Sequence, residues 1–325
     1  MVSAAVEKPH GQDATKESAP RAFSRSERFL MGLIHTLRRS PLSLRSAIGY
    51  TGGFLFGFIP SRERLAVRLQ LRAFFGPPTP FLVNRIFANA GRTSLESLNL
   101  KPILQNVDRH VVCSNWGEIE KWLADERPIV ALTGHTGNWD LLGAYYIAKG
   151  IPITTVGKEA QNPAAQEVLR SIREEYGIET VWRSDRSGVK RLLECMRTRR
   201  TVAVLIDQDT RVDSVYAPFF GEMAKTPSAI VALAQKANAR LVTAFMFRTG
   251  RARFETFIQE LDSSKAPEQI LTEYNHRLEA LIRRFPDQWV WFHKRWRSRP
   301  NGECLSRRDY FAWLKSLPPR GASGQ

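Results

Sequence analysis

The chain has 325 residues, a formal net charge of +16 at pH 7 and an apolar content of 43%. This length can bury one large core or two smaller ones, and the apolar content is ordinary for a globular protein. Its three cysteines, Cys113, Cys195 and Cys304, show no C-x-x-C spacing. Their pattern argues against a disulfide framework or a zinc site and indicates a reducing compartment.

The excess positive charge lies at the two ends of the chain. Residues 21–80 contain ten arginines and two glutamates, and residues 283–320 contain ten basic and three acidic residues. Such ends suit anionic lipid headgroups, nucleic acid or an acidic protein partner, although a basic surface that only aids solubility also fits. No nucleic-acid motif accompanies the charge, so we expect no nucleic acid among the partners.

The N-terminal quarter of the chain divides into three parts. Residues 1–25 are polar, and we expect them to be a disordered lead rather than a signal peptide. Residues 26–76 carry two apolar patches, 29–34 and 47–59, between arginines; the second patch has 13 residues, whereas a spanning helix needs about 20. We therefore predict a helical membrane-associating segment over 26–76, and leave open whether 47–59 inserts into the membrane or packs on the remaining protein.

From residue 128 onward, short β-branched runs alternate with helical patterns, which is typical of βαβ units. We predict an α/β fold with a largely parallel central sheet flanked by helices, in one α/β domain of residues 77–317, followed by a tail at 318–325. Proline marks three expected helix starts, at Pro163, Pro227 and Pro267. The expected strands are Ile129–Leu132, Ile151–Val156, Ile178–Trp182, Val202–Ile206, Leu241–Phe247 and Arg253–Ile258, and the expected helices are Trp139–Ala148, Pro163–Tyr176, Gly188–Arg197, Pro227–Ala237 and Pro267–Arg284.

Chemistry-bearing side chains follow three of these strands. His135 comes after the first strand with Asp140 five residues further on, and Asp207-Gln208-Asp209 follows another apolar strand. Parallel strands end at one edge of a sheet, where open α/β folds bind their ligands. We therefore expect these residues to converge on one cleft with Arg183 and Arg186, which follow a third strand. A histidine there can take a proton from a hydroxyl while a carboxylate holds its tautomer.

Each of these features has a structural alternative. His135 alone could be a loop histidine that caps a helix, and Arg183 and Arg186 could form surface pairs with Asp185 or Glu179. If the two arginines are functional, they would bind an anionic group through charge-assisted hydrogen bonds. Asp207 and Asp209 could position an acceptor or hold Mg²⁺, since paired aspartates at a strand end suit that ion.

Together these blocks resemble the bacterial lipid A biosynthesis (lauroyl/myristoyl) acyltransferases, a branch of the lysophospholipid acyltransferase superfamily. His135 and Asp140 match the H-x4-D/E motif, and Asp185-Arg186 is similar to the second block. Asp207-Gln208-Asp209 and the stretch 218–221 match the D-x-D and P-F-F-G segments, and residues 286–295 resemble the C-terminal signature. The lipid A enzymes usually carry Glu where this chain has Asp140, which leaves the acceptor open.

The resemblance implies acyl transfer from a thioester of acyl carrier protein or coenzyme A to a hydroxyl of a lipid A precursor or related glycolipid. It implies no metal and no cofactor beyond the acyl co-substrate, and a peripheral or monotopic place on the cytoplasmic face of a bacterial inner membrane with an anionic surface. We expect His135 to be the general base, Asp140 to orient it, and the N–H groups of Gly137 and Asn138 to stabilise the oxyanion. Another lipid acceptor, or a His/Asp thioesterase or lipid hydrolase, is the alternative.

Overall fold

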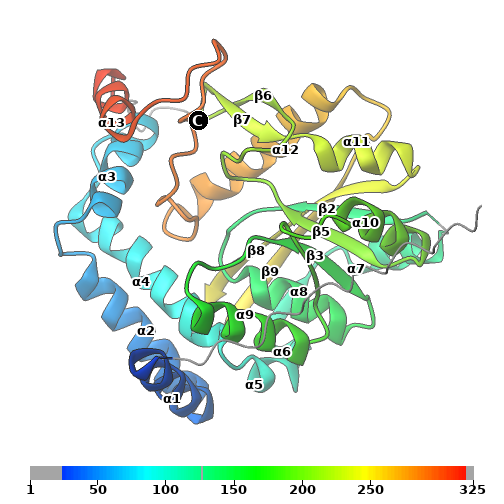
Figure 1. The fold of residues 1–325 in the computed structure, drawn as a ribbon, viewed down its shortest axis with the longest axis horizontal. Helices are drawn as coiled ribbons and strands as arrows, with labels where there is room; N and C mark the ends of the chain where they lie inside the picture. Colours follow the sequence, from blue (N-terminus) through cyan, green and yellow to red (C-terminus); the bar gives the residue numbers. More distant parts are fainter. Residues whose placement is uncertain (1–23, 126, 320–325) are drawn as a thin grey trace, which may run out of the picture.

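The computed structural model describes residues 24–125 and 127–319, so the predicted disordered lead lies outside it except for its last two residues. A three-layer α/β sandwich follows a group of N-terminal helices (Figure 1). The helices are α1 (Arg25–Arg39), α2 (Leu42–Phe56), α3 (Arg62–Phe75), α4 (Pro80–Ser97), α5 (Lys101–Leu104), α6 (Val107–His110), α7 (Trp116–Ala124), α8 (Trp139–Ala148), α9 (Pro163–Glu175), α10 (Gly188–Arg197), α11 (Ala229–Lys236), α12 (Pro267–Arg284) and α13 (Arg307–Ser316).

The central sheet has seven strands in the order β1-β9-β8-β2-β5-β3-β4. Five of its six strand pairings are parallel, and only β8 and β9 pair antiparallel, which confirms the prediction of a largely parallel sheet. A separate antiparallel hairpin, β6–β7, was not predicted. The strands are β1 (Val111–Cys113), β2 (Ile129–Thr133), β3 (Ile153–Gly157), β4 (Glu179–Trp182), β5 (Thr201–Leu205), β6 (Ser214–Phe219), β7 (Glu222–Pro227), β8 (Arg240–Gly250) and β9 (Arg253–Leu261).

Both faces of the sheet are buried, and alternate residues of each strand enter different cores. Val130 and Val202 pack in the core beneath α10, α11 and α12, whereas Ala131 and Ile153 pack in the core beneath α7, α8 and α9. This burial explains why the strands read as short apolar runs rather than alternating ones.

One predicted helix start is wrong. Pro227 ends β7, and α11 begins only at Ala229. The proline ring fits the strand because it lies at its end in a two-stranded hairpin, where its missing N–H removes no bond from a central ladder.

Glycines hold α2 tightly against α4, and the two helices lie side by side along one flank of the molecule (Figure 1). A Cβ atom on Gly49 or Gly53 would overlap the backbone of α4 at Gly91 or Phe87, and one on Gly57 would lie 2.9 Å from the Asn84 Cα. The regular spacing of these glycines lets the two backbones approach closely, as small residues do in packed helix pairs. The predicted N-terminal helical segment is therefore a set of helices, α1 to α3, and α2 is anchored through α4.

Many apolar side chains of α1, α2 and the following turn face solvent. They include Phe29, which is 77% exposed, and Leu55, Phe56, Phe58 and Ile59, each about half exposed. Among the described residues, none of the helices has both the length and the apolar character needed to cross a bilayer.

The two basic ends of the sequence meet in space. Helix α3 packs against α13 near the C-terminus (Figure 1). The Arg72 guanidinium donates to the Lys315 carbonyl at 3.2 Å. Part of the excess charge that is split in the sequence, on α3 and around α13, therefore lies together in the fold.

Candidate active site

His135 lies two residues after β2, in a loop that is fixed from three sides. The Gly137 N–H donates to the Gln288 carbonyl at 2.8 Å, and the Val290 N–H donates to the His135 carbonyl at 3.2 Å. Gly137 has a φ of +50°, and a Cβ there would overlap the Met246 carbonyl oxygen, so the position requires glycine. The loop geometry is therefore set by backbone contacts, which hold the imidazole in one place.

The carboxylate bonded to the His135 ring is Asp207. Its Oδ1 lies 2.8 Å from His135 Nδ1, and its Oδ2 accepts the His135 backbone N–H at 2.8 Å and the Trp289 indole N–H at 2.9 Å. The two residues meet because β2 and β5 are neighbours whose last residues, Thr133 and Leu205, are paired in register. This is the convergence at one sheet edge that the sequence predicts for His135 and Asp207.

Asp207 is only 1% exposed, yet it is held as an anion. Burial alone would raise the pKa of this carboxyl, but the positive charge of His135, its two hydrogen bonds and the Trp289 indole together bring the pKa below its usual range. Since an ionised carboxylate can only accept, Nδ1 of His135 carries the proton of the neutral ring and Nε2 keeps its lone pair. The His135 side chain is 24% exposed, so this Nε2 can meet a substrate.

Gln208 and His293 complete the polar cluster. The Gln208 Nε2 lies 3.3 Å from His135 Nε2 and 2.7 Å from His293 Nε2. Burial and the nearby His135 charge lower the pKa of His293 to about 4, although Asp207 opposes the shift. His293 is therefore neutral near pH 7, and its Nε2 can accept from the Gln208 amide.

The expected pairing of His135 with Asp140 is corrected by this geometry. Among the described residues, Asp207 is the sole carboxylate within hydrogen-bond distance of the His135 ring, and Asp140 lies in the first turn of α8 with its Oδ1 4.0 Å from the Arg173 Nε. Burial raises the pKa of Asp140, against the charges of Arg173 and His135. Asp140 is thus close enough for the His135 charge to affect its pKa, whereas Asp207 is the residue that orients the ring.

Of the two predicted oxyanion donors, one is occupied and the other belongs to a buried residue. The Gly137 N–H is committed to the Gln288 carbonyl, and Asn138 is fully buried. The Asn138 side chain caps α8 instead, because its Oδ1 accepts the Leu141 N–H at 2.9 Å. These two residues build the loop and the start of the helix rather than presenting N–H groups to a ligand.

Three further predicted residues lie apart from the histidine. Arg183 and Arg186 follow β4, the edge strand, and both are exposed; within the described parts of the chain they have no contact with His135 or Asp207. Asp209 accepts the Ser298 N–H at 2.8 Å and so fixes the loop after Trp296. The expected cleft therefore gathers His135, Asp140, Asp207 and Gln208, but not the arginines.

Arg173 is a residue that the sequence did not single out. Its side chain from α9 is 13% exposed, its Nη1 is buried without a partner in the described structure, and its guanidinium lies over the Trp182 ring at 5.7 Å. It is the buried cation that accompanies Asp140. In the sequence, Arg173 looks like any arginine on an amphipathic helix.

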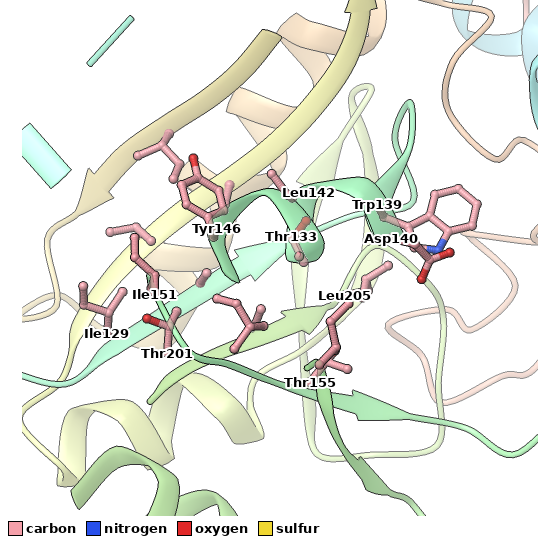
Figure 2. Close-up of a pocket in the computed structure, with 18 of the residues that line it drawn as sticks. Ile129, Thr133, Trp139, Asp140, Leu142, Tyr146, Ile151, Thr155, Thr201 and Leu205 are labelled. Atoms are coloured by element: carbon pink, nitrogen blue, oxygen red, sulfur yellow. The ribbon is translucent and has the colours of Figure 1, made fainter. Parts of the chain in front are cut away.

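An apolar cavity opens beside this cluster and runs beneath the sheet. Figure 2 shows Trp139 and Asp140 at one end and Ile129 and Ile151 at the other. The cavity volume is about 80 Å³, counted as the space open to the centre of a water-sized group, so it has room for several groups of that size. The lining has almost no polar surface apart from Asp140, Arg173 and a few threonines.

The cavity exists because small residues lie side by side on this face of the sheet. Ala131 of β2 is paired with Ala203 of β5, which is paired in turn with Thr155 of β3. Gly143 of α8 also lines the cavity. Along β2 the cavity follows the strand from Ile129 to Thr133, a rise of about 13 Å at roughly 3.3 Å per residue.

The fold and the site define an α/β protein with a His–Asp pair next to one end of an apolar cavity, an arrangement suited to chemistry on an acyl chain. The chain belongs to the bacterial lipid A biosynthesis acyltransferase family, whose model matches residues 16–298. The match confirms the family that the sequence motifs resemble, and it covers most of the chain.

Individual relatives are similar at low identity. The chain is 25% identical to a lipid A biosynthesis acyltransferase of Haemophilus influenzae over 58% of this chain and 59% of the relative. It is 25% identical to a phosphatidylinositol mannoside acyltransferase of Mycolicibacterium smegmatis over 52% of this chain and 57% of the relative. A lipid A biosynthesis acyltransferase 2 of Shigella flexneri is 22% identical over 85% of this chain and 91% of the relative. The match to the first two therefore spans less than two thirds of their length.

Proposed function

We propose that this protein is a membrane-associated O-acyltransferase, which moves a fatty acyl group from a thioester to a hydroxyl of a lipid A precursor or related glycolipid. The observation that carries the proposal is the His135–Asp207 pair beside Trp139, which lines one end of the apolar cavity. A base beside an apolar cavity suits a reaction between a lipid hydroxyl and an activated acyl group.

In the proposed mechanism, His135 Nε2 takes the proton of the acceptor hydroxyl while the hydroxyl oxygen attacks the thioester carbonyl. Asp207 stabilises the imidazolium that forms, as the buried carboxylate of a hydrolase triad does. The tetrahedral intermediate then collapses, the C–S bond breaks, and the proton passes from His135 to the leaving sulfur. No covalent enzyme intermediate is needed, because the thioester is already activated.

The oxyanion of the intermediate needs a donor close to His135. With the N–H groups of Gly137 and Asn138 occupied or buried, the side-chain amide of Gln208 is our candidate, since its nitrogen lies 3.3 Å from His135 Nε2. His293 accepts one N–H of this amide, and the second N–H lies toward His135 Nε2. When His135 Nε2 has taken the proton of the acceptor, it can no longer accept a hydrogen bond, and this second N–H can donate to the oxyanion.

The apolar cavity is proposed to hold the acyl chain of the donor. Its walls are aliphatic and aromatic, and one end lies at Trp139, whose ring centroid is 5.1 Å from that of His135. A chain that lies along the strands from this end would keep its carbonyl beside the base. The far end at Ile129, Ile151 and Trp122 would limit the length of the chain.

The donor carrier is proposed to be acyl carrier protein or coenzyme A, both of which are anionic. Arg62, Lys294, Arg297 and Arg307 form a basic surface at the junction of α3 and α13; partial burial and the charges of Arg307, Arg297 and Arg62 lower the pKa of Lys294. Lys294 follows His293 directly, so this surface borders the catalytic cluster. An acidic carrier would be attracted to it.

Membrane association is supported by the exposed apolar residues of α1, α2 and the turn after α2, together with nearby arginines. Aromatic and aliphatic side chains flanked by cations suit the headgroup boundary of an anionic membrane. This placement would be peripheral or monotopic, on the cytoplasmic face of the inner membrane.

The proposal is tested by mass spectrometry of total lipids from cells with the gene, without it, and with a His135→Ala copy. We expect a glycolipid lighter by one acyl group in the second and third strains, which would name the acceptor and the chain. A change confined to a phospholipid would instead favour another acceptor. Unchanged lipids in the deletion strain would count against the proposal.

A further inference from the structure

A second, polar cavity lies between the α2–α4 helix pair and the end of β8. We call it the Arg92 pocket, and its volume is about 350 Å³. Its polar lining consists of Tyr50, Arg85, Asn89, Arg92, Arg248, Asp287 and Gln288, so it holds three arginines and one carboxylate. Arg85, Asn89 and Arg92 come from one face of α4, spaced by about one and two helical turns. This pocket is separate from the proposed acyl cavity, because the two have no lining residue in common.

Two of the three arginines in this pocket already have acidic partners. Arg85 forms an ion pair with Asp287, and Arg248 forms one with the buried Glu96. The Arg248 side chain is also held by the Phe254 ring, 4.3 Å from its guanidinium carbon. These contacts shape the wall of the pocket and neutralise two of its charges.

Arg92 is different, because it has no polar partner among the described residues. Its guanidinium lies over the Tyr50 ring at 4.3 Å, and its Nε is buried without a hydrogen bond. Arg92 and Arg248 are close enough for the Arg92 charge to lower the pKa of Arg248, alongside the larger effect of burial. An unpaired guanidinium beside a second arginine leaves a net positive charge in a preformed hollow.

The pocket adjoins the catalytic loop. Thr93, the residue after Arg92, donates its hydroxyl to the Gly137 carbonyl at 2.7 Å, and Gln288 lines the pocket while accepting the Gly137 N–H. It also adjoins α2, part of the proposed membrane face, since Tyr50 of α2 lines it. Its wall further includes Phe81 of α4, which is 59% exposed and contacts Phe54 of α2 with the ring centroids 5.8 Å apart. A group bound here would be held at the headgroup boundary, next to the loop that carries His135.

We propose that the Arg92 pocket binds a phosphate group of the lipid acceptor, with Arg92 as the principal donor and Asn89 and Arg85 beside it. Guanidinium groups bind phosphate oxygens in pairs, and a stacked aromatic ring keeps the fork in one orientation. The acceptor class would then be phosphorylated glycolipids, positioned by their phosphate so that a hydroxyl reaches His135. This inference rests on the proposed function, because it concerns the acceptor of that reaction.

The experiment uses the full chain and three variants: Arg92→Ala, Arg92→Lys and, as a charge-matched control, Arg109→Ala on the exposed helix α6. The first readout is the KM for a phosphorylated glycolipid acceptor and for the same acceptor after phosphatase treatment. We expect Arg92→Ala to raise the KM for the phosphorylated acceptor about 10- to 100-fold, and that for the dephosphorylated one much less. Arg92→Lys should give a smaller rise, and Arg109→Ala none. Equal changes for the two acceptors would overturn the proposal.

Two binding measurements separate the source of the phosphate and do not depend on turnover. Calorimetry with a hexosamine 1-phosphate and with the free hexosamine should show binding of the phosphate form alone, lost in Arg92→Ala. Flotation with phosphatidylcholine vesicles, with and without phosphatidic acid, measures whether the protein binds membrane phospholipids that are not acceptors. If Arg92→Ala reduced only vesicle binding and left the KM ratio unchanged, the pocket would bind membrane phospholipid and the proposal would be wrong. If the protein proved inactive, loss of sugar-phosphate binding in Arg92→Ala would still support the site, and retention would overturn it.

Discussion

Replacing Asp207 by Asn tests whether this carboxylate is the partner of His135. The substitution keeps the size of the side chain but removes its charge and one of its two acceptor oxygens. With charge centres about 4 Å apart and an effective dielectric constant of about 20, the Asp207–imidazolium pair is worth about 4 kcal/mol. Because 1.4 kcal/mol is a factor of ten in rate, we expect kcat to fall about 10³-fold, close to the roughly 10⁴-fold seen for the corresponding change in a serine protease triad.

The assay follows the transfer of a labelled acyl group from a thioester to the acceptor by purified protein, with circular dichroism to confirm folding. Nitrogen NMR of the histidine ring provides a second readout, since Asp207→Asn should remove the hydrogen-bonded Nδ1–H signal. Asp140→Asn is the matched control for this signal and should retain it, because Asp140 is not bonded to the ring. A folded Asp207→Asn protein with more than a tenth of the wild-type kcat would refute the reasoning.

Three other predictions follow from packing and titration. Ala203→Leu should fill part of the proposed acyl cavity and lower kcat/KM for long-chain donors about tenfold or more, while a short-chain donor is affected far less. Equal losses for the two donors would show that the chain does not lie there. Gly53→Val should push α2 from α4 and reduce the free energy of unfolding by about 1–3 kcal/mol, as measured in urea, whereas Gly52→Val, whose Cβ meets open space, should change it much less. His293 has a folded pKa of about 4 against an ordinary 6.5, so the unfolded chain binds more protons between these values and stability should be lost as pH falls from about 6.5 to 4. The loss is about 3 kcal/mol and should be smaller in His293→Gln; a pH profile that the substitution leaves unchanged would contradict the assignment.

The sequence predicts the core of the fold because its parallel strands and crossover helices have strong local signals. Helices α8, α10 and α12 have the predicted bounds, and the ends of β2 and β5 meet as expected. The β6–β7 hairpin was missed because its residues are mixed polar and aromatic and lack a tight two-residue turn signal.

The misplaced site residues and the cavity could not be predicted, because they depend on strand order and side-chain direction. Arg183 follows β4, which lies two strands away from β5 at the sheet edge, and no local pattern encodes that order. Asp140 is near His135 in the sequence, but it lies in the first turn of α8 at the cavity, whereas Asp207 comes to the ring from the adjacent strand. The cavity itself depends on the register that places Ala131 beside Ala203.

The central claim is acyl transfer to a lipid hydroxyl with His135 as the base. The most direct test incubates the purified protein with a labelled acyl thioester and a phosphorylated glycolipid and follows the label by mass spectrometry. The account predicts that the acceptor gains the mass of one acyl group and that His135→Ala abolishes this gain. Release of the label only as free fatty acid, or full transfer by the His135→Ala protein, would contradict it.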